Sequence, residues 1–224
     1  MEKEIMGAGQ TDFSRKLPVA KEGIQIAFYF IFGAIIAFYL NLKIPGFIFV
    51  FFAGFVLFFF RDPDRVSPEG DNLILSPADG TVIEIEKVKE DKFLKTDSLK
   101  VSIFLSIFNV HINRSPVSGK IKYFEYQKGK FLIASKKEAT DKNEKNIIGI
   151  EGKRFNLLVY QITGLIARRV VFWLGMEDNV SAGERIGLMK FGSRMDVFCP
   201  INTQIKVKIG DKVRAGESIL GVVG

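Results

Sequence analysis

The chain has 224 residues and a formal net charge of +7, from 32 basic and 25 acidic residues, with a pI near 9.4. Its length suits one domain of ordinary size with an additional segment. A single cysteine, Cys199, excludes an internal disulfide, and with only one histidine we predict no metal site. A basic balance suits an anionic membrane, an acidic substrate or nucleic acid. Because the basic residues are dispersed and no binding motif is visible, we expect no nucleic-acid role.

The N-terminal quarter of the chain contains the apolar block. Residues 1–23 are polar and mixed in charge, and many of the 22 phenylalanines then gather in residues 24–60. Two uncharged runs, Ile24 to Leu40 and Gly46 to Phe60, are separated by a short break that contains Pro45. Each run is slightly short for a bilayer core of about 30 Å, because a helix needs roughly 20 residues to span it.

Three interpretations of residues 24–60 compete. They are a helical hairpin that crosses the membrane twice, a re-entrant or interfacial anchor, and a helix pair buried in a protein core. Core helices normally carry a polar face, which these runs lack, so we favour the hairpin. Lys16 and Lys21 precede it, and Arg61 and Arg65 follow it. Positive charge on both flanks places both ends in the cytoplasm.

Residues 61–224 carry the pattern of a mainly β domain. Short apolar and β-branched runs alternate with Gly, Pro, Asn and Asp, and no amphipathic helix is visible. The polar segment 136–146 predicts a loop. The expected strands are Leu73–Leu75, Thr81–Val88, Lys100–Phe108, Lys120–Tyr126, Phe131–Ala134, Arg154–Ile162 and Ala167–Leu174.

An internal echo suggests how this domain is built. The sequences Ser76-Pro77-Ala78-Asp79-Gly80-Thr81-Val82 and Ser115-Pro116-Val117-Ser118-Gly119-Lys120-Ile121 share the pattern S-P-x-x-G-x-[V/I]. Near the C-terminus, Gly210-Asp211 and Ala215-Gly216-Glu217 predict turns that flank short strands. This pattern resembles the barrel-sandwich hybrid architecture of biotinyl and lipoyl domains. The sequence therefore predicts such a β domain, preceded by a hydrophobic α-helical hairpin.

Three places in the chain could carry chemistry. In Gly192-Ser193, the serine hydroxyl could attack the carbonyl carbon of the preceding glycine, which has no Cβ to cover it. His111, between a strand and a turn, has the side chain best suited to move protons at neutral pH. Asp79 lies in the Pro-Ala-Asp-Gly turn, where an aspartate more often binds its own backbone.

Together these motifs resemble the phosphatidylserine decarboxylase family in its short form. The resemblance runs from about Phe59 to the C-terminus and loosely through the hydrophobic block. It is carried by Phe60-Arg61-Asp62-Pro63, Ser76-Pro77-Ala78-Asp79-Gly80, Val110-His111-Ile112-Asn113-Arg114 with Pro116 and Gly119, and Phe191-Gly192-Ser193.

The resemblance implies a proenzyme that cuts itself between Gly192 and Ser193. The products would be a β chain, residues 1–192, and an α chain, residues 193–224, which stay together as a heterodimer. Ser193 would become a pyruvoyl group, the cofactor for conversion of phosphatidylserine to phosphatidylethanolamine. The family's assisting aspartate and histidine carry over onto Asp79 and His111.

The chain departs from longer members of the family at two positions. Where those members have a second histidine, this chain has Arg114, so His111 would serve both maturation and decarboxylation, or Arg114 would take one task. Where they have Leu-Gly-Ser-Thr, this chain has Phe-Gly-Ser-Arg. Arg114 and Arg194 are the candidates for binding the lipid phosphate, because they lie next to the motifs.

The resemblance also implies a location and a partner. Residues 24–60 would hold the enzyme in the cell membrane, with the catalytic domain on the cytoplasmic side and phosphatidylserine as its lipid partner. Two alternatives stay open, namely the same chemistry on a different serine lipid, and a membrane-anchored carrier or adaptor of the lipoyl or biotinyl kind with a modified Lys190. The sequence leaves the lipid tail and any higher oligomer undecided.

Overall fold

A computed structural model describes residues 18–136, 138–164, 170–189 and 193–224. The described chain divides into two compact units, one ending at Asp64 and the other beginning at Arg65. Residues 1–17 of the polar segment 1–23 lie outside the described residues, and so do Lys190 and Gly192.

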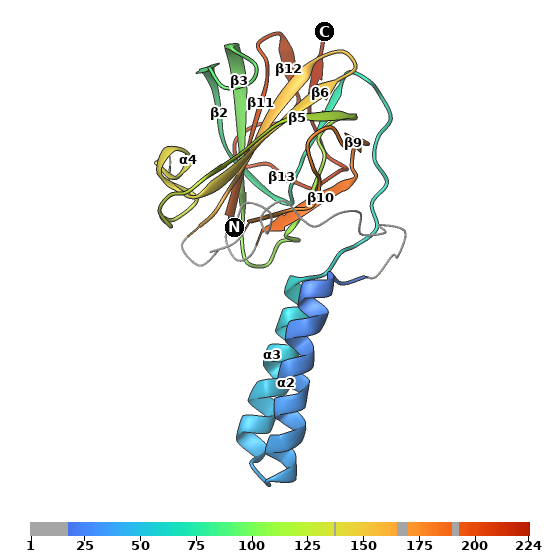
Figure 1. The fold of residues 1–224 in the computed structure, drawn as a ribbon, viewed down its shortest axis with the longest axis vertical. Coiled ribbons are helices and arrows are strands. Elements are labelled where there is room, and N and C mark those ends of the chain that lie inside the picture. The colour runs from blue at the N-terminus through green and yellow to red at the C-terminus, as the bar shows by residue number, and fades with distance from the viewer. Residues whose placement is uncertain (1–17, 137, 165–169, 190–192) are drawn as a thin grey trace. The chain divides into compact units, whose positions relative to one another are not determined.

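The first unit is a pair of antiparallel helices, α2 (Lys21–Tyr39) and α3 (Lys43–Phe59), which lie side by side in Figure 1. Small residues line the contact between them, among them Ala27 and Ala34 of α2 and Ala53 of α3, which are buried. A Cβ added to Gly46 would lie 2.5 Å from the Phe38 ring, so this glycine permits the close approach. Small residues at the contact with large apolar residues outside it are typical of helices packed in lipid.

Both helices are apolar around most of their circumference. Phe28, Tyr29, Phe47 and Phe51 are each more than 60% exposed. By length and composition, α2 is long and apolar enough to cross a membrane, and α3 is a shorter apolar helix. The predicted hydrophobic helix pair is therefore confirmed, while its place in a membrane stays a prediction.

The second unit is built on an eight-stranded, curled antiparallel sheet with the order β13-β2-β3-β11-β7-β6-β5-β9, and Figure 1 shows β2, β3 and β11 side by side. Two smaller sheets have the orders β4-β10-β8 and β1-β14-β12. The strands are β1 (Leu73–Leu75), β2 (Gly80–Glu90), β3 (Thr96–Leu105), β4 (Ile112–Arg114), β5 (Gly119–Gln127), β6 (Lys145–Gly152), β7 (Asn156–Ile162), β8 (Val170–Phe172), β9 (Asn179–Val180), β10 (Arg185–Met189), β11 (Ser193–Pro200), β12 (Thr203–Ile205), β13 (Lys212–Val213) and β14 (Ile219–Val223).

The two faces of the large sheet bury different side chains. Alternate residues of β11 point to opposite faces. Met195, Val197 and Cys199 belong to the main hydrophobic core, together with residues of β3 such as Ile103. Phe198 belongs to a smaller cluster on the other face. Ser193 lies two residues before Met195 and points to the same face, so we place it on the core side of the sheet.

The sequence echo is a structural repeat. Ser76 and Ser115 each donate a hydroxyl hydrogen bond, at 2.7 Å, to the carbonyl two residues on. The backbone N–H of Gly216 donates to the Ser76 carbonyl and that of Gly183 to the Ser115 carbonyl, both at 2.8 Å. Both glycines have positive φ, +73° and +78°, which favours glycine at these turns. Two Ala-Gly-Glu turns thus close two S-P-x-x-G turns, and the mainly β domain is confirmed.

The expected segments were wrong in three places. The strand expected at Lys100–Phe108 ends at Leu105, because the Asn109 N–H bonds the Ser106 carbonyl and closes a turn there. Of the strand expected at Ala167–Leu174, residues 167–169 lie outside the described residues. Phe131–Ala134 is not a strand but lies in the connection between β5 and β6, because Asn143 hydrogen-bonds both the N–H and the carbonyl of Leu132. The segment expected as a loop, 136–146, contains the one-turn helix α4 (Ala139–Lys142) and the start of β6. The polar composition of α4 conceals that Ala139 and Thr140 are buried.

The core predicts a clear contrast between two isoleucines. Ile103 is fully buried, whereas Ile209 is 62% exposed. We expect Ile103→Ala to destabilise the domain by about 2–5 kcal/mol, since it removes buried methylene groups and leaves a cavity. The same change at Ile209 should cost less than about 0.5 kcal/mol. Thermal unfolding of the full chain in detergent, followed by Trp173 fluorescence, measures both, and equal losses would contradict this description of the core.

Candidate active site

Ser193 is the first residue of β11 and sits at one end of the large sheet. It pairs with Leu105, the last residue of β3. On the other side, Arg194 pairs with Ile162, the last residue of β7. The Ser193 side chain is fully buried, and among the described residues its Oγ has no hydrogen-bond partner. A buried hydroxyl without a partner is costly and calls for an explanation.

His111 reaches the same end of the sheet by a different route. It follows the β3–β4 turn and is only 2% exposed. Its carbonyl accepts a hydrogen bond from the N–H of Met189, the last residue of β10, at 3.1 Å. Only residues 190–192 separate Met189 from Ser193, so chain length alone keeps those two residues within about 15 Å. Ser193 is therefore only a short segment away from Met189, the residue whose N–H contacts His111.

The ring of His111 is oriented by its own turn. Its Nδ1 lies 2.9 Å from the carbonyl oxygen of Asn109. A carbonyl can only accept, so Nδ1 carries the hydrogen and Nε2 is the basic nitrogen of the neutral ring. The turn is fixed in its own right, because Asn109 Oδ1 accepts hydrogen bonds from the N–H and the hydroxyl of Ser106.

Asp79 lies directly before β2, whose first residues pair with the end of β3. It is thus at the same end of the sheet as Ser193. One oxygen accepts the N–H of Ala215 at 2.8 Å, and Arg65 donates to the carboxylate at 3.0 Å. Ser118 occupies the equivalent place in the repeat and accepts the N–H of Ala182 at 2.8 Å. Turn closure is therefore shared by Asp79 and Ser118, whereas the carboxylate and its arginine belong to Asp79 alone.

Arg65 was expected only as a positive flank of the apolar block. In the structure its guanidinium joins Asp79 to Glu217, with the second ion pair at 2.8 Å. The Arg65 side chain is 9% exposed. Sequence reasoning missed this role because Glu217 lies far away in the chain, and charge near an apolar run is fully explained by the membrane boundary.

The two arginines proposed for the substrate phosphate are buried. Arg114 donates to the carbonyl of Gly183 at 2.9 Å and packs against the backbone at Gly216. Arg194 pairs with Asp196 at 2.6 Å and with Glu84 at 2.7 Å, on the sheet face opposite the main core. Its side chain is 1% exposed. These contacts favour a structural role for Arg194 over phosphate binding.

The charges around Arg194 form a connected group. Ser102 accepts a third hydrogen bond from Arg194, and Thr140 donates to Asp196 at 2.9 Å. Lys100 contacts Glu84 at 3.2 Å. Burial works against the charge of Arg194, but the carboxylates of Asp196 and Glu84 outweigh it and raise its pKa. Burial likewise opposes ionisation of Glu84, yet the hydrogen bonds from Arg194 and Lys100 prevail and lower its pKa.

A buried amide cluster, which sequence analysis did not single out, links β4 to the large sheet. Gln161 of β7 donates to Asn113 Oδ1 at 2.8 Å and accepts from Asn146 of β6 at 3.2 Å. All three side chains are fully buried. Because His111 lies two residues before Asn113, the Gln161–Asn113 hydrogen bond also fixes the strand that follows the histidine.

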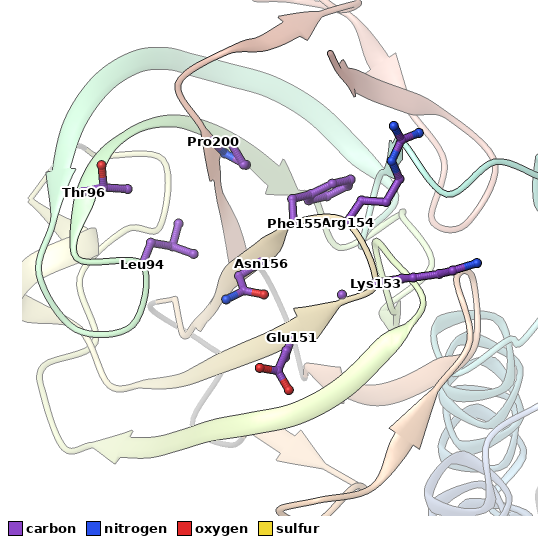
Figure 2. A pocket seen from close by; sticks show the side chains of 9 residues that line it. Leu94, Thr96, Glu151, Lys153, Arg154, Phe155, Asn156 and Pro200 are labelled. Carbon is purple, nitrogen blue, oxygen red and sulfur yellow. The ribbon is translucent and has the colours of Figure 1, made fainter.

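An open pocket of about 490 Å³ lies at the opposite end of the sheet. It is lined by residues where β3 and β7 begin and where β6 and β11 end, including Thr96, Asn156, Gly152 and Pro200. Figure 2 shows Leu94 and Thr96 across the pocket from Lys153 and Arg154. Its place separates it from Ser193, so we do not assign it to the site. Within the described ranges, no three His, Cys, Asp or Glu side chains come together as metal ligands do.

The fold is a β-rich domain with an apolar helix pair, and comparison with known proteins supplies the family. A family model described as phosphatidylserine decarboxylase matches residues 52–221. Proteins named phosphatidylserine decarboxylase proenzyme are similar to the chain. Those from Desulfotalea psychrophila and Geobacter metallireducens are 41% and 42% identical over 93% and 92% of this chain, and over 98% and 97% of their own lengths. The one from Syntrophus aciditrophicus is 49% identical over 75% of this chain and 79% of its own.

The chain therefore belongs to the phosphatidylserine decarboxylase family, which confirms the resemblance predicted from the motifs. It is an enzyme with decarboxylase function.

The buried charges predict a dependence of stability on pH. The pKa of Glu84 is lower in the folded chain than its ordinary value of 4.5, so its ion pairs stabilise the fold above that pH. This contribution is lost as the pH falls through the folded pKa. We expect Glu84→Gln to lower the melting temperature clearly at pH 7 and progressively less below pH 4.5. Glu69→Gln, at an exposed position, is the control, and a gap that does not shrink in acid would contradict the prediction.

Proposed function

We propose that the chain is a proenzyme that cleaves itself between Gly192 and Ser193 and then decarboxylates phosphatidylserine to phosphatidylethanolamine. The observation that carries the proposal is the buried Ser193 hydroxyl, without a partner among the described residues, at a strand start that is held close to His111. The names of the relatives support the substrate. Gly192 lies outside the described residues.

Cleavage begins with attack by the Ser193 oxygen on the Gly192 carbonyl carbon. The C–N bond breaks and an ester forms, while the serine proton passes to the released amine. Loss of the Ser193 α-proton then expels the Gly192 carboxylate and leaves a dehydroalanine. Water converts this to a pyruvoyl group and releases ammonia. The α chain is therefore lighter by one ammonia than a 193–224 peptide that begins with serine.

His111 is the base that we propose for this sequence. Its Nδ1 hydrogen is engaged by Asn109, so Nε2 is the nitrogen that can take the serine proton. Asp79 contributes a carboxylate at the same sheet end, and we propose that its charge stabilises the protonated histidine at a distance. Its direct contacts are with Arg65 and Ala215, so its hydrogen bonds hold the turn.

After cleavage, β11 would hold the new terminus in place. The α chain would begin at Ser193 and keep the pairing of β11 with β3 and β7, both of which belong to the β chain. This pairing supports a non-covalent heterodimer. A pyruvoyl group there would supply the electron sink that decarboxylation of an amino-acid headgroup requires. His111, held at the same place, would return a proton to the carbon that loses carbon dioxide.

The location in the membrane is part of the proposal. The apolar helix pair would hold the enzyme in the cell membrane, with the catalytic domain on the cytoplasmic side, where a lipid substrate lies within reach. The headgroup chemistry is the same for other serine lipids, so the lipid tail is decided by assay. No observation favours the carrier function, and its Lys190 lies outside the described residues.

Replacement of the nucleophile gives the first test. Ser193→Ala should yield a single uncut chain without decarboxylase activity, because the attacking oxygen is absent. Intact-mass spectrometry of the purified protein measures this directly. Wild-type protein should give two fragments, the smaller lighter by one ammonia than its serine-started form.

The matched control is Ser135→Ala, at an exposed position, which should be processed like the wild type. Cleavage of the Ser193→Ala chain at the same bond would overturn the serine mechanism. An uncut wild-type chain with a modified Lys190 would instead favour the carrier.

Replacement of the base gives the second test. We expect His111→Ala to slow cleavage about 100-fold or more, in line with the usual contribution of a positioned general base. The time course of chain cleavage after synthesis in a cell-free system measures the rate. Normal cleavage and normal turnover in this variant would remove His111 from the mechanism.

A further inference from the structure

Two connections leave the large sheet at the end where Ser193 lies. The β3–β4 turn follows Leu105, which pairs with Ser193. The β5–β6 connection begins after Gln127, which pairs with Lys145 of β6. Lys145 also pairs with Ile162 of β7, and Ile162 pairs with Arg194, the residue after Ser193. Strand register thus places both connections at the edge where the reaction would occur, although they are well separated in sequence.

The β5–β6 connection combines exposed lysines with apolar side chains. Lys128, Lys130 and Lys136 are exposed, and Ile133 between them is 47% exposed. Five lysines outnumber three acidic residues in the sequence 128–144, so the connection keeps a net positive charge. Apolar residues flanked by lysines are typical of segments that rest on anionic lipid.

The connection is held close to the sheet rather than hanging from it. Asn143, which is 1% exposed, hydrogen-bonds both backbone groups of Leu132 at 2.8–2.9 Å. The same amide donates to the carbonyl of Thr163 at 2.7 Å. Thr163 directly follows Ile162, the strand partner of Arg194. This hydrogen bond therefore attaches the connection to the end of β7 that lies beside the start of β11. Ile133 is therefore presented from a fixed position.

Phe108 is the apolar tip of the other connection. It is 65% exposed within a turn that is closed by the Asn109 N–H to Ser106 carbonyl hydrogen bond at 3.0 Å. The carbonyl of Asn109 in turn holds His111. Exposing the phenylalanine ring to water is unfavourable, and transferring it into lipid is favourable. The ring is held near the candidate base by the same turn.

We propose that Phe108, Ile133, Lys128, Lys130 and Lys136 form a membrane-contacting face that rests on an anionic bilayer around the active site. The inference rests on the proposed function, because a lipid headgroup must reach Ser193. The occupant is a lipid surface rather than a protein, since the apolar residues are few and are flanked by positive charge that complements lipid phosphates.

Insertion can be measured without reference to activity. In the full chain, Phe108→Trp combined with Trp173→Phe leaves one tryptophan, at the tip of the face. We expect its fluorescence in phosphatidylglycerol-containing vesicles to be quenched when the acyl chains carry bromine. Ile201→Trp with Trp173→Phe is the control, because Ile201 is 43% exposed and follows Pro200 at the opposite end of β11. Equal quenching at both positions, or none at residue 108, would overturn the proposal.

Activity separates membrane contact from chemistry. We expect Phe108→Ser/Ile133→Ser to lower turnover of phosphatidylserine in vesicles about tenfold, from the lost transfer of apolar area into lipid. Turnover of a short-chain phosphatidylserine dissolved as monomers should change less than about twofold. The matched control Met176→Ser/Ile201→Ser should affect neither substrate.

Equal losses on both substrates would show that the two residues support the fold rather than the membrane contact. If the wild type turned over neither substrate, the proposed function would fail, while the quenching result would still decide the membrane contact.

Discussion

The pairing of β11 between β3 and β7 is the constraint on which the site depends. It fixes Ser193 at the start of a buried strand, whose following residues Arg194 to Phe198 pair with β3 on one side and β7 on the other. A serine on a mobile loop would meet its upstream carbonyl only rarely, whereas a strand end presents its hydroxyl in one place. The same pairing lets a chain that begins at residue 193 remain in the fold, since its partners lie upstream. Strand pairing would thus serve both steps of the proposed function, because it positions Ser193 for cleavage and would keep the two products together.

Buried charge reinforces that strand. Arg194 and Asp196 alternate with core residues. The ion pair of Arg194 with Glu84 reaches β2, and the hydrogen bond that Asp196 accepts from Thr140 reaches α4. Such pairs add little net stability, because desolvation offsets their attraction, but leaving one partner alone is costly. They therefore specify which segments lie next to β11. At the place of Asp79 in the repeat, closing the turn requires only a hydrogen-bond acceptor, because Ser118 does the same at the equivalent place. The carboxylate of Asp79 additionally binds Arg65.

A lipid substrate would account for the exposed apolar side chains of Phe108 and Ile133 at the same end of the domain as the candidate site. A headgroup stays at the membrane surface, so a reactive group in the proposed site is useful only where the domain can approach lipid. The turn that holds His111 also carries Phe108. The amide of Asn143 connects the loop of Ile133 to Thr163, at the end of β7 beside the start of β11. The open pocket at the other end of the sheet shares none of these features.

The sequence by itself determined the apolar helix pair, the mainly β character, the strands β1, β2, β3, β5, β7 and β8, the S-P-x-x-G echo and the family. These follow from local composition, period-two alternation and motifs that are contiguous in the chain. It failed at Phe131–Ala134, an apolar run whose backbone is taken by Asn143, and at α4, whose buried face is too short to show periodicity. Only the tertiary structure decided that Arg65 binds Asp79 and Glu217, that Arg194 is internally paired, and that Gln161 joins Asn113. The contacts of Arg65 with Glu217, of Arg194 with Glu84 and of Gln161 with Asn113 join segments far apart in sequence. A side chain's partners depend on which strands become neighbours, and local sequence patterns do not encode that.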